Sequence, residues 1–132
     1  MSKTSPLITD DLELNDAFVT TKGASRNDLS PPLSIRQQRL SKLEALLHEN
    51  QPTLCRAISE DFGHRSPHET RLLEIFPGLE GIRHTRKQLK RWLKPQKRSV
   101  PLWFQPGRAE VRPQPLGCVG IVTPWNYPLF LA

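Results

Sequence analysis

The sequence predicts an α/β chain in which helices come first and the opening strand of a parallel sheet follows. Three observations lead to this class. Apolar residues recur at three- and four-residue spacing between residues 34 and 93, as they do in amphipathic helices. A continuous apolar run over Leu116–Val122 is typical of a strand that is buried on both faces. Seven of the thirteen prolines lie between Pro95 and Pro128, and they indicate an extended connection between the two parts.

The composition excludes several classes of protein. Hydrophobic residues make up 36% of the 132 residues and charged residues 24%, which is typical of a globular chain. The two cysteines, Cys55 and Cys118, are too few for a disulfide scaffold and too far apart in sequence to form a Cys-x-x-Cys metal site. No apolar run approaches the ~18 residues of a membrane span. No apolar signal region opens the chain, so we expect a cytoplasmic protein. We also expect no metal and no membrane partner.

Three segments are predicted along the chain. Residues 1–32 are polar, contain scattered apolar residues and end in Ser-Pro-Pro, so we expect a flexible N-terminal arm. Residues 33–95 form a helical segment. Residues 96–132 form an extended ribbon followed by an incomplete first βα unit.

The helical segment begins with two predicted helices. Ser34 and Gln37 fit a capping box that begins a leucine-rich helix ending near Asn50. Pro52 then begins a second helix, because proline is tolerated in the first turn. Gly63 is placed to end that helix as its C-cap.

The third predicted helix has the clearest local signal in the chain. Ser66-Pro67 supplies an N-cap and a proline at the first helical position, and Glu69 follows within the first turn. We expect this helix to continue until Pro95 stops it. Pro77-Gly78 lies inside the span and predicts a kink or a short interruption there.

The second half of this helix carries the positive charge of the chain. Residues 81–109 contain nine basic residues and no acid, whereas the rest of the chain carries ten basic and thirteen acidic residues. Arg83, Lys87 and Arg91 follow each other at four-residue spacing, which predicts a solvated basic face and no nucleic-acid partner. The alternative is a small basic helical module that binds nucleic acid or a partner protein.

The last segment changes from helical to extended. Residues 100–104 and 109–112 alternate and are interrupted by prolines, which predicts ribbon or edge strands. After the buried-type strand at Leu116–Val122, residues 123–126 predict a turn, with Asn126 as a helix N-cap and Pro128 in the first turn of the next helix. A parallel strand needs a neighbour and a crossover, so we expect a fragment that ends inside its first βα unit.

The segment Pro115–Pro128, with the sequence PLGCVGIVTPWNYP, resembles the opening of the cofactor-binding domain in NAD(P)-dependent aldehyde dehydrogenases. Residues 74–95 resemble the bacterial coniferyl aldehyde dehydrogenase branch of this family. The resemblance covers residues 34–132. It implies a truncated aldehyde dehydrogenase fold with the first strand of a Rossmann-like domain, and NAD or NADP as cofactor. It also implies an aromatic aldehyde as substrate, a carboxylic acid as product and a homo-oligomeric full-length enzyme.

The resemblance also implies roles for individual residues. In the family a cysteine thiolate attacks the aldehyde, hydride passes to the nicotinamide, and a glutamate base drives hydrolysis of the thioester. Asn126 would donate its side-chain amide to the oxyanion, an interaction worth roughly 3 kcal/mol, and Tyr127 would face the aldehyde tunnel. The cofactor would lie along Val122, Thr123, Pro124 and Trp125.

The same resemblance predicts that this chain alone is inactive. The nucleophilic cysteine and the glutamate base lie further along the family's sequence, and neither Cys55 nor Cys118 matches a catalytic position. On the local pattern alone Asn126 is interpreted as an N-cap, whereas the resemblance favours the oxyanion role.

Overall fold

The computed structural model describes the backbone of residues 7–132 and the side chains from Leu12 onward. These residues group into two compact units. One comprises the chain up to Pro31 together with Gln114–Gly120, and the other comprises Pro32–Pro113 together with Ile121–Ala132. No helix in the described part of the chain has both the length and the apolar character needed to cross a membrane.

The first unit is built around helix α1, Leu7–Asn27. This helix was not predicted from the sequence. The segment contains no proline and one glycine, so nothing in it breaks a helix, although its scattered apolar residues gave no amphipathic pattern. Gly117, with a φ of 90°, approaches Ser25 so closely that a Cβ at this glycine would lie 3.3 Å from the serine Oγ.

The second unit begins with helices α2, Leu33–Glu49, and α3, Gln51–Phe62. The predicted capping box is wrong, because Pro32 occupies the N-cap position and Ser34 already lies within the helix. The Pro32 carbonyl accepts the first helical hydrogen bond, from Arg36. The end of α3 is as predicted, since Gly63 adopts the left-handed conformation with a φ of 84°.

The third predicted helix is present, with an altered turn near its start. It comprises α4, Pro67–Thr70, a π-helical turn η1, Arg71–Ile75, and α5, Phe76–Trp92. The N-cap prediction is confirmed, because Ser66 Oγ accepts a hydrogen bond from the backbone N–H of His68 at 3.3 Å. The helix also ends before Pro95, as expected.

Pro77 and Gly78, where an interruption was predicted, lie within the regular helix α5, and the irregular turn is η1, just before it. The Phe76 amide bonds to the Arg71 carbonyl, five residues earlier instead of four. Pro77 follows directly and has no N–H to donate to the previous turn, so the widened turn accommodates it. Two consecutive residues of this turn, Glu74 and Ile75, are buried.

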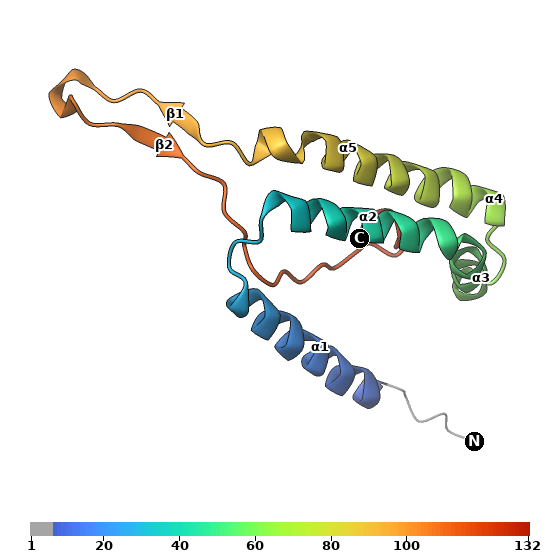
Figure 1. The fold of residues 1–132 in the computed structure, drawn as a ribbon. Coiled ribbons are helices and arrows are strands. Elements are labelled where there is room, and N and C mark those ends of the chain that lie inside the picture. The colour runs from blue at the N-terminus through green and yellow to red at the C-terminus, as the bar shows by residue number, and fades with distance from the viewer. Residues whose placement is uncertain (1–6) are drawn as a thin grey trace. The chain divides into compact units, whose positions relative to one another are not determined.

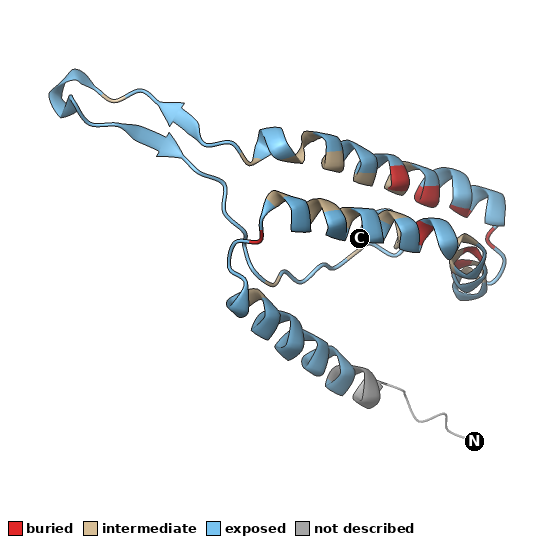
Figure 2. Cartoon of the chain, viewed as in Figure 1, coloured by how far each residue is buried: buried red, intermediate tan, exposed pale blue. Residues whose placement is uncertain are grey.

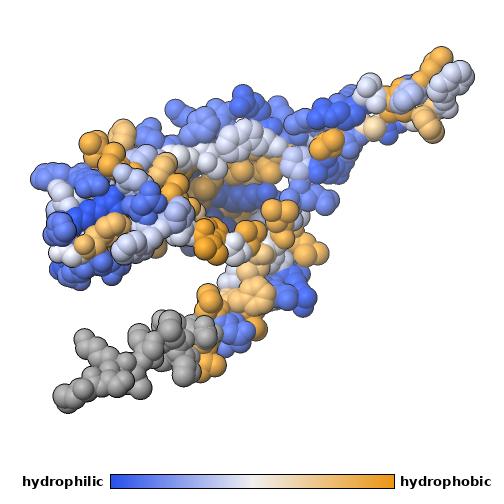
Figure 3. Space-filling view, turned by 180° about the vertical axis from the view of Figure 1, so that it is seen from behind, coloured by the Kyte–Doolittle hydropathy of each residue, from blue (hydrophilic) through white to orange (hydrophobic). Residues whose placement is uncertain are grey.

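A small antiparallel hairpin follows α5. Strand β1, Gln96–Arg98, pairs with β2, Ala109–Val111, with Lys97 opposite Glu110. The strand expected over residues 109–112 is confirmed, but the one over residues 100–104 is wrong, because Leu102–Phe104 form a 3₁₀ turn. Two prolines near this turn lack the N–H that a strand ladder needs. The tip of the hairpin exposes hydrophobic side chains (Figure 3).

The predicted buried strand at Leu116–Val122 is not formed. These residues are irregular, and Val122 is 99% exposed. A parallel strand is stabilised by a neighbour, and the described residues contain none that pairs with this segment. The described chain is thus mainly helical with one two-stranded antiparallel hairpin, so the β part of the α/β prediction is limited to that hairpin.

The core of the second unit lies where α2 and α5 run side by side (Figure 1). Buried residues occur on the facing turns of these helices and on α3 (Figure 2). Partly buried hydrophobic residues, among them Leu129 near the end of the chain, pack against this core. The C-terminal turn is thereby attached to the helices. The buried cluster consists of Leu47, Cys55, Ile75 and Leu79.

Candidate functional site

The predicted site residues, 122–127, lie just before, on and just after a turn at Trp125–Asn126. A single helical hydrogen bond follows, from the Leu131 amide to the Tyr127 carbonyl at 3.2 Å. This bond makes residues 127–131 a helical segment of a single turn, but the helix that was predicted to follow Asn126 is not formed in the described residues. Tyr127 occupies the N-cap position of this segment, because its carbonyl accepts the first bond.

The capping group of this segment comes from η1. Glu74 Oε2 accepts hydrogen bonds from the backbone amides of Leu129, at 2.8 Å, and Phe130, at 3.3 Å. These are the second and third residues of the segment, whose amides an N-cap side chain normally satisfies. The prediction that Asn126 is the N-cap is wrong, because its carboxamide makes no hydrogen bond to the described residues and the residue is exposed.

Arg65 holds the other side of the turn. Its side chain is 5% exposed, and Nη1 lies 2.9 Å from both the backbone carbonyl oxygen of Asn126 and Glu74 Oε1. The bond to the carbonyl is well aligned, whereas the contact with Glu74 is ionic and lacks hydrogen-bond alignment. Nη2 lies 3.4 Å from Glu69 Oε1. One guanidinium therefore connects the turn with both α4 and η1.

Aromatic rings flank this guanidinium. Its central carbon lies 5.0 Å from the ring centroid of Phe62 and 4.9 Å from that of Tyr127. Phe62 also stacks on Trp125, with 5.0 Å between centroids and an angle of 11° between the rings. These cation–π and stacking contacts add packing to the polar contacts of Arg65.

Local sequence signals explain how Arg65 reaches this place. Gly63 ends α3 with a left-handed residue, and Ser66 begins α4 three residues later. Arg65 therefore lies in a short link between two capped helices, which fixes its backbone. Thr70 and Glu74, four residues apart, are both fully buried on the helix that follows.

A pocket of about 570 Å³ opens beside this arrangement. It brings together two of the predicted site residues, Asn126 and Tyr127. The four residues expected along the cofactor do not line it; of these, Val122 and Trp125 are exposed by 99% and 72%. The pocket is lined by Phe62, His64, Arg65, Ser66, Glu69, Asn126 and Tyr127.

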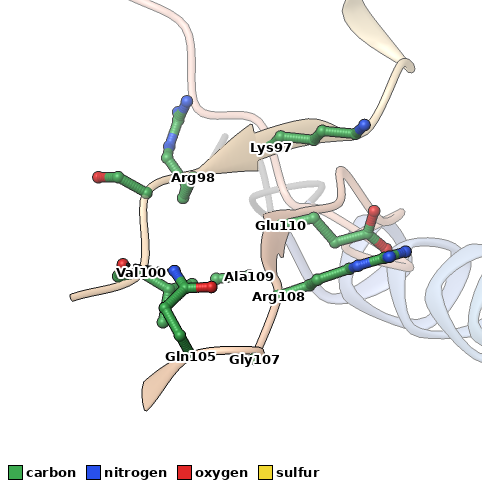
Figure 4. Close-up of a pocket in the computed structure, with 9 residues that line it drawn as sticks. Lys97, Arg98, Val100, Gln105, Gly107, Arg108, Ala109 and Glu110 are labelled. Atoms are coloured by element: carbon green, nitrogen blue, oxygen red, sulfur yellow. Dashed lines mark hydrogen bonds between the residues drawn. The ribbon is translucent and has the colours of Figure 1, made fainter. Parts of the chain in front are cut away.

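A larger pocket, of about 670 Å³, lies in the β1–β2 hairpin (Figure 4). Figure 4 shows Lys97, Arg108 and Glu110 extending to one side of the hairpin, while Gln105 donates a hydrogen bond to the Val100 carbonyl on the other. It contains none of the predicted site residues. The size of a pocket therefore does not identify the predicted site in this chain.

Two arginines on the basic face of α5 form ion pairs with a glutamate of α2. Arg83 Nε lies 2.7 Å from Glu44 Oε1, and Arg86 Nη1 lies 2.8 Å from Glu44 Oε2, so both cations pair with α2. The hydrogen bond from Arg83, assisted by the charge of Arg86, lowers the pKa of the Glu44 carboxyl below its usual 4.5. The predicted solvated face is confirmed in part, since the side chains of Arg83 and Arg86 are 46% and 40% exposed but are paired with Glu44. Lys87, Lys90 and Arg91 are exposed.

Sequence reasoning missed the residues that hold the turn, namely Arg65 and Glu74. A signal for Glu74 was present, because this acid lies within the apolar stretch Leu72–Phe76. An acid in such a stretch is buried only with a partner. No comparable local signal identified Arg65 as that partner.

Comparison of the sequence with known proteins identifies its family. The sequence matches the model of the aldehyde dehydrogenase family over residues 9–132. It is 45% identical to a probable coniferyl aldehyde dehydrogenase of Pseudomonas aeruginosa, over 91% of this chain and 25% of that protein. It is 33% identical to a coniferyl aldehyde dehydrogenase of a Pseudomonas species, over 91% of this chain and 24% of that protein.

A mammalian protein is similar over the same region. The bovine aldehyde dehydrogenase family 3 member B1 is 35% identical over 90% of this chain and 24% of its own length. The chain spans about a quarter of the length of these curated relatives. The family match covers nearly all of the described residues, and the chain belongs to the aldehyde dehydrogenase family.

Proposed function

We propose that this chain supplies the oxyanion-binding amide of an NAD(P)-dependent aldehyde dehydrogenase, and that Asn126 carries this amide. The observation that supports the proposal is the division of roles at the turn. Glu74 caps the helical segment, and the Asn126 carboxamide has no hydrogen bond to the described residues. An exposed amide on a fixed backbone is free to donate to a substrate.

The chemistry suits a neutral donor. Attack on an aldehyde carbonyl concentrates negative charge on its oxygen, and a donor already oriented toward that oxygen stabilises the charge without reorganising. The backbone carbonyl of Asn126 is held by Arg65 at 2.9 Å, so the carboxamide starts from a defined position. Asparagine keeps the same charge state at every pH in this role, unlike a histidine or lysine donor.

The cofactor is proposed to be NAD or NADP, which accepts the hydride from the substrate. Residues 122–125 fit one wall of such a site, because they lie outside any helix or strand and Val122 and Trp125 expose their side chains. Trp125 is additionally oriented by its stack on Phe62. We assign Val122, Thr123, Pro124 and Trp125 to this wall.

The substrate is proposed to be an aromatic aldehyde that is oxidised to its acid. Two of the similar proteins are named coniferyl aldehyde dehydrogenases, which supports this class. Tyr127 lines the same pocket as Asn126, so its ring is suited to the wall of an aldehyde tunnel. The wider enzyme also needs a nucleophilic cysteine and a glutamate base, and this chain offers neither at a matching position.

The proposal is tested with a chimaera in which this chain replaces the matched quarter of the P. aeruginosa relative. The chimaera should form NAD(P)H when it is mixed with coniferyl aldehyde and NAD or NADP. Asn126→Ala should lower kcat by about 10²–10³-fold, the usual cost of one oxyanion donor. The 132-residue chain by itself should form no NAD(P)H.

The matched control is Gln38→Ala, which removes an exposed amide on α2 and should leave kcat unchanged. A folded chimaera that forms no NAD(P)H contradicts the proposed activity. Full kcat in Asn126→Ala contradicts the role of Asn126. Turnover by the purified 132-residue chain would show that the chemistry does not need the missing groups.

A further inference from the structure

We propose that Arg65 and Glu74 are positioning residues that together fix the orientation of Asn126. This inference rests on the oxyanion role proposed above for Asn126. Three contacts carry it: Arg65 to the Asn126 carbonyl, Arg65 to Glu74, and Glu74 to the amides that follow the turn. They connect residues 61, 9 and 55 positions apart in sequence, as the numbering of each pair shows.

The contacts hold the backbone on both sides of the Asn126 side chain. Nη1 of Arg65 fixes the carbonyl of Asn126 itself, and Glu74 Oε2 fixes the amides of Leu129 and Phe130. The carboxamide is then separated from a fixed backbone by only two side-chain torsions. Fixing the peptide plane therefore restricts where the amide can point.

The guanidinium itself has little freedom. It is nearly buried, lies against the rings of Phe62 and Tyr127, and has its charge balanced by the fully buried carboxylate of Glu74. The planar group offers several donors in fixed directions, which a lysine ammonium does not. Arg65 can thus serve the carbonyl of Asn126 and the carboxylate of Glu74 at the same time.

Glu74 has a second effect on the site. Because its carboxylate caps the helical segment, the amide side chain of Asn126 is not needed for capping. The contacts of Arg65 and Glu74 with each other and with the turn are together called the clamp. Within it the charge of the guanidinium is balanced by the carboxylate of Glu74. The pair separates the structural task of the turn from its catalytic task.

The test is a double-mutant cycle in the chimaera, with Arg65→Lys, Asn126→Ala and the double variant. Arg65→Lys should lower kcat by about 10–100-fold, since a misplacement of ~1 Å can cost that much. The KM for the aldehyde should stay within about twofold, because transition-state contacts are lost and substrate binding is not. The double variant should be no slower than Asn126→Ala, because both changes act through one donor.

The control for the charge-conserving change is Arg86→Lys, which alters the exposed pair with Glu44 and should keep full kcat. Glu74→Gln gives a second cycle, since glutamine can still accept from the two amides but no longer balances Arg65. It should show the same lack of additivity with Asn126→Ala.

The outcomes separate the two proposals. Additive losses in both cycles, or full kcat in Arg65→Lys and Glu74→Gln while Asn126→Ala is impaired, overturn the clamp and leave the oxyanion role intact. Full kcat in Asn126→Ala overturns the oxyanion role, and the clamp falls with it. A lowered kcat in Arg65→Lys and Glu74→Gln, with losses that are not additive with that of Asn126→Ala, supports both the clamp and the oxyanion role.

Discussion

Two sets of arginine–glutamate contacts join distant segments of the second unit, and they differ in burial. Arg65 and Glu74 have side chains that are 5% and 0% exposed, and they hold the turn at Asn126. Arg83 and Arg86 pair with Glu44 between α5 and α2, but their side chains are 46% and 40% exposed. The same chemistry is therefore used once inside the protein and once at its surface.

The difference indicates two different uses. Burying an ion pair costs desolvation energy, which the contacts of the two side chains with each other, with Glu69 and with the turn must offset. Such a pair suits the fixing of one backbone position, as at Asn126. The surface pairs keep their water and are weakened by salt, so they help to align two helices without fixing any single atom.

Removal of one partner of the buried pair should have the largest effect on stability. Glu74→Leu leaves the buried Arg65 with only the partly exposed Glu69 as a counter-charge, 3.4 Å away, and should lower the free energy of unfolding by about 3–5 kcal/mol. Urea titration of the 132-residue chain measures this loss. Arg65→Met combined with Glu74→Leu should recover much of it, because no buried charge remains. A double variant that is less stable than Glu74→Leu would show that the buried pair is net stabilising.

A substitution in the link between α3 and α4, which contains Arg65, should cause the next largest loss of stability. Gly63→Ala places a side chain on a residue with a φ of 84°, which should cost about 1–2 kcal/mol of stability. Gly81→Ala is the matched control, because it lies inside α5 with open space around it and should stabilise by about 0.5–1 kcal/mol. Equal effects of the two changes would show that the left-handed cap is unimportant.

The aromatic contacts of Phe62 with Trp125 and Arg65 should contribute less to stability. Phe62→Leu keeps an apolar side chain but removes the stack on Trp125 and the face presented to Arg65. The expected loss is about 0.5–1.5 kcal/mol. With Trp92 and Trp103 replaced by phenylalanine, the fluorescence of Trp125 should also shift toward that of a solvated indole. An unchanged spectrum would contradict the stack.

Loss of the ion pairs of Glu44 with Arg83 and Arg86 should have the smallest effect on stability. The size of this effect should depend on pH and salt. Arg83 lowers the pKa of Glu44, so the carboxylate stabilises the fold above its usual pKa of 4.5 and loses that contribution as the pH falls below it. Thermal unfolding of Glu44→Gln and of the parent should therefore differ slightly near neutral pH and converge in acid. The difference should also vanish at about 1 M salt. A difference that persists in acid would contradict this assignment.

The parts of the fold that depend on neighbouring residues could be predicted from sequence. Gly63 and Ser66 supply their caps within a few residues of the helices they end or begin, and both are found as expected. The prediction of a strand at Leu116–Val122 was wrong because a strand needs a partner strand elsewhere in the chain, and the described residues contain none that pairs with it. Helix α1 was missed because its sequence lacks an amphipathic pattern, although it contains no strong helix breaker.

In the candidate site, too, only the residues that belong to a local sequence motif could be predicted. Asn126 and Tyr127 could be named from a motif of adjacent residues, and they line one pocket. The clamp could not, because the contact from Arg65 to Asn126 spans 61 positions in the sequence. The burial of Glu74 within an apolar stretch required a cationic partner, but no local pattern determines which cation reaches it.

The central claim is that a buried pair fixes the turn at Asn126, and amide hydrogen exchange tests it most directly. The amides of Leu129 and Phe130 donate to Glu74, so they should exchange slowly in the 132-residue chain and in Glu44→Gln. In Glu74→Leu they should exchange at least about tenfold faster, measured where the helices remain folded. Equal exchange of these two amides in Glu74→Leu and Glu44→Gln would contradict the claim.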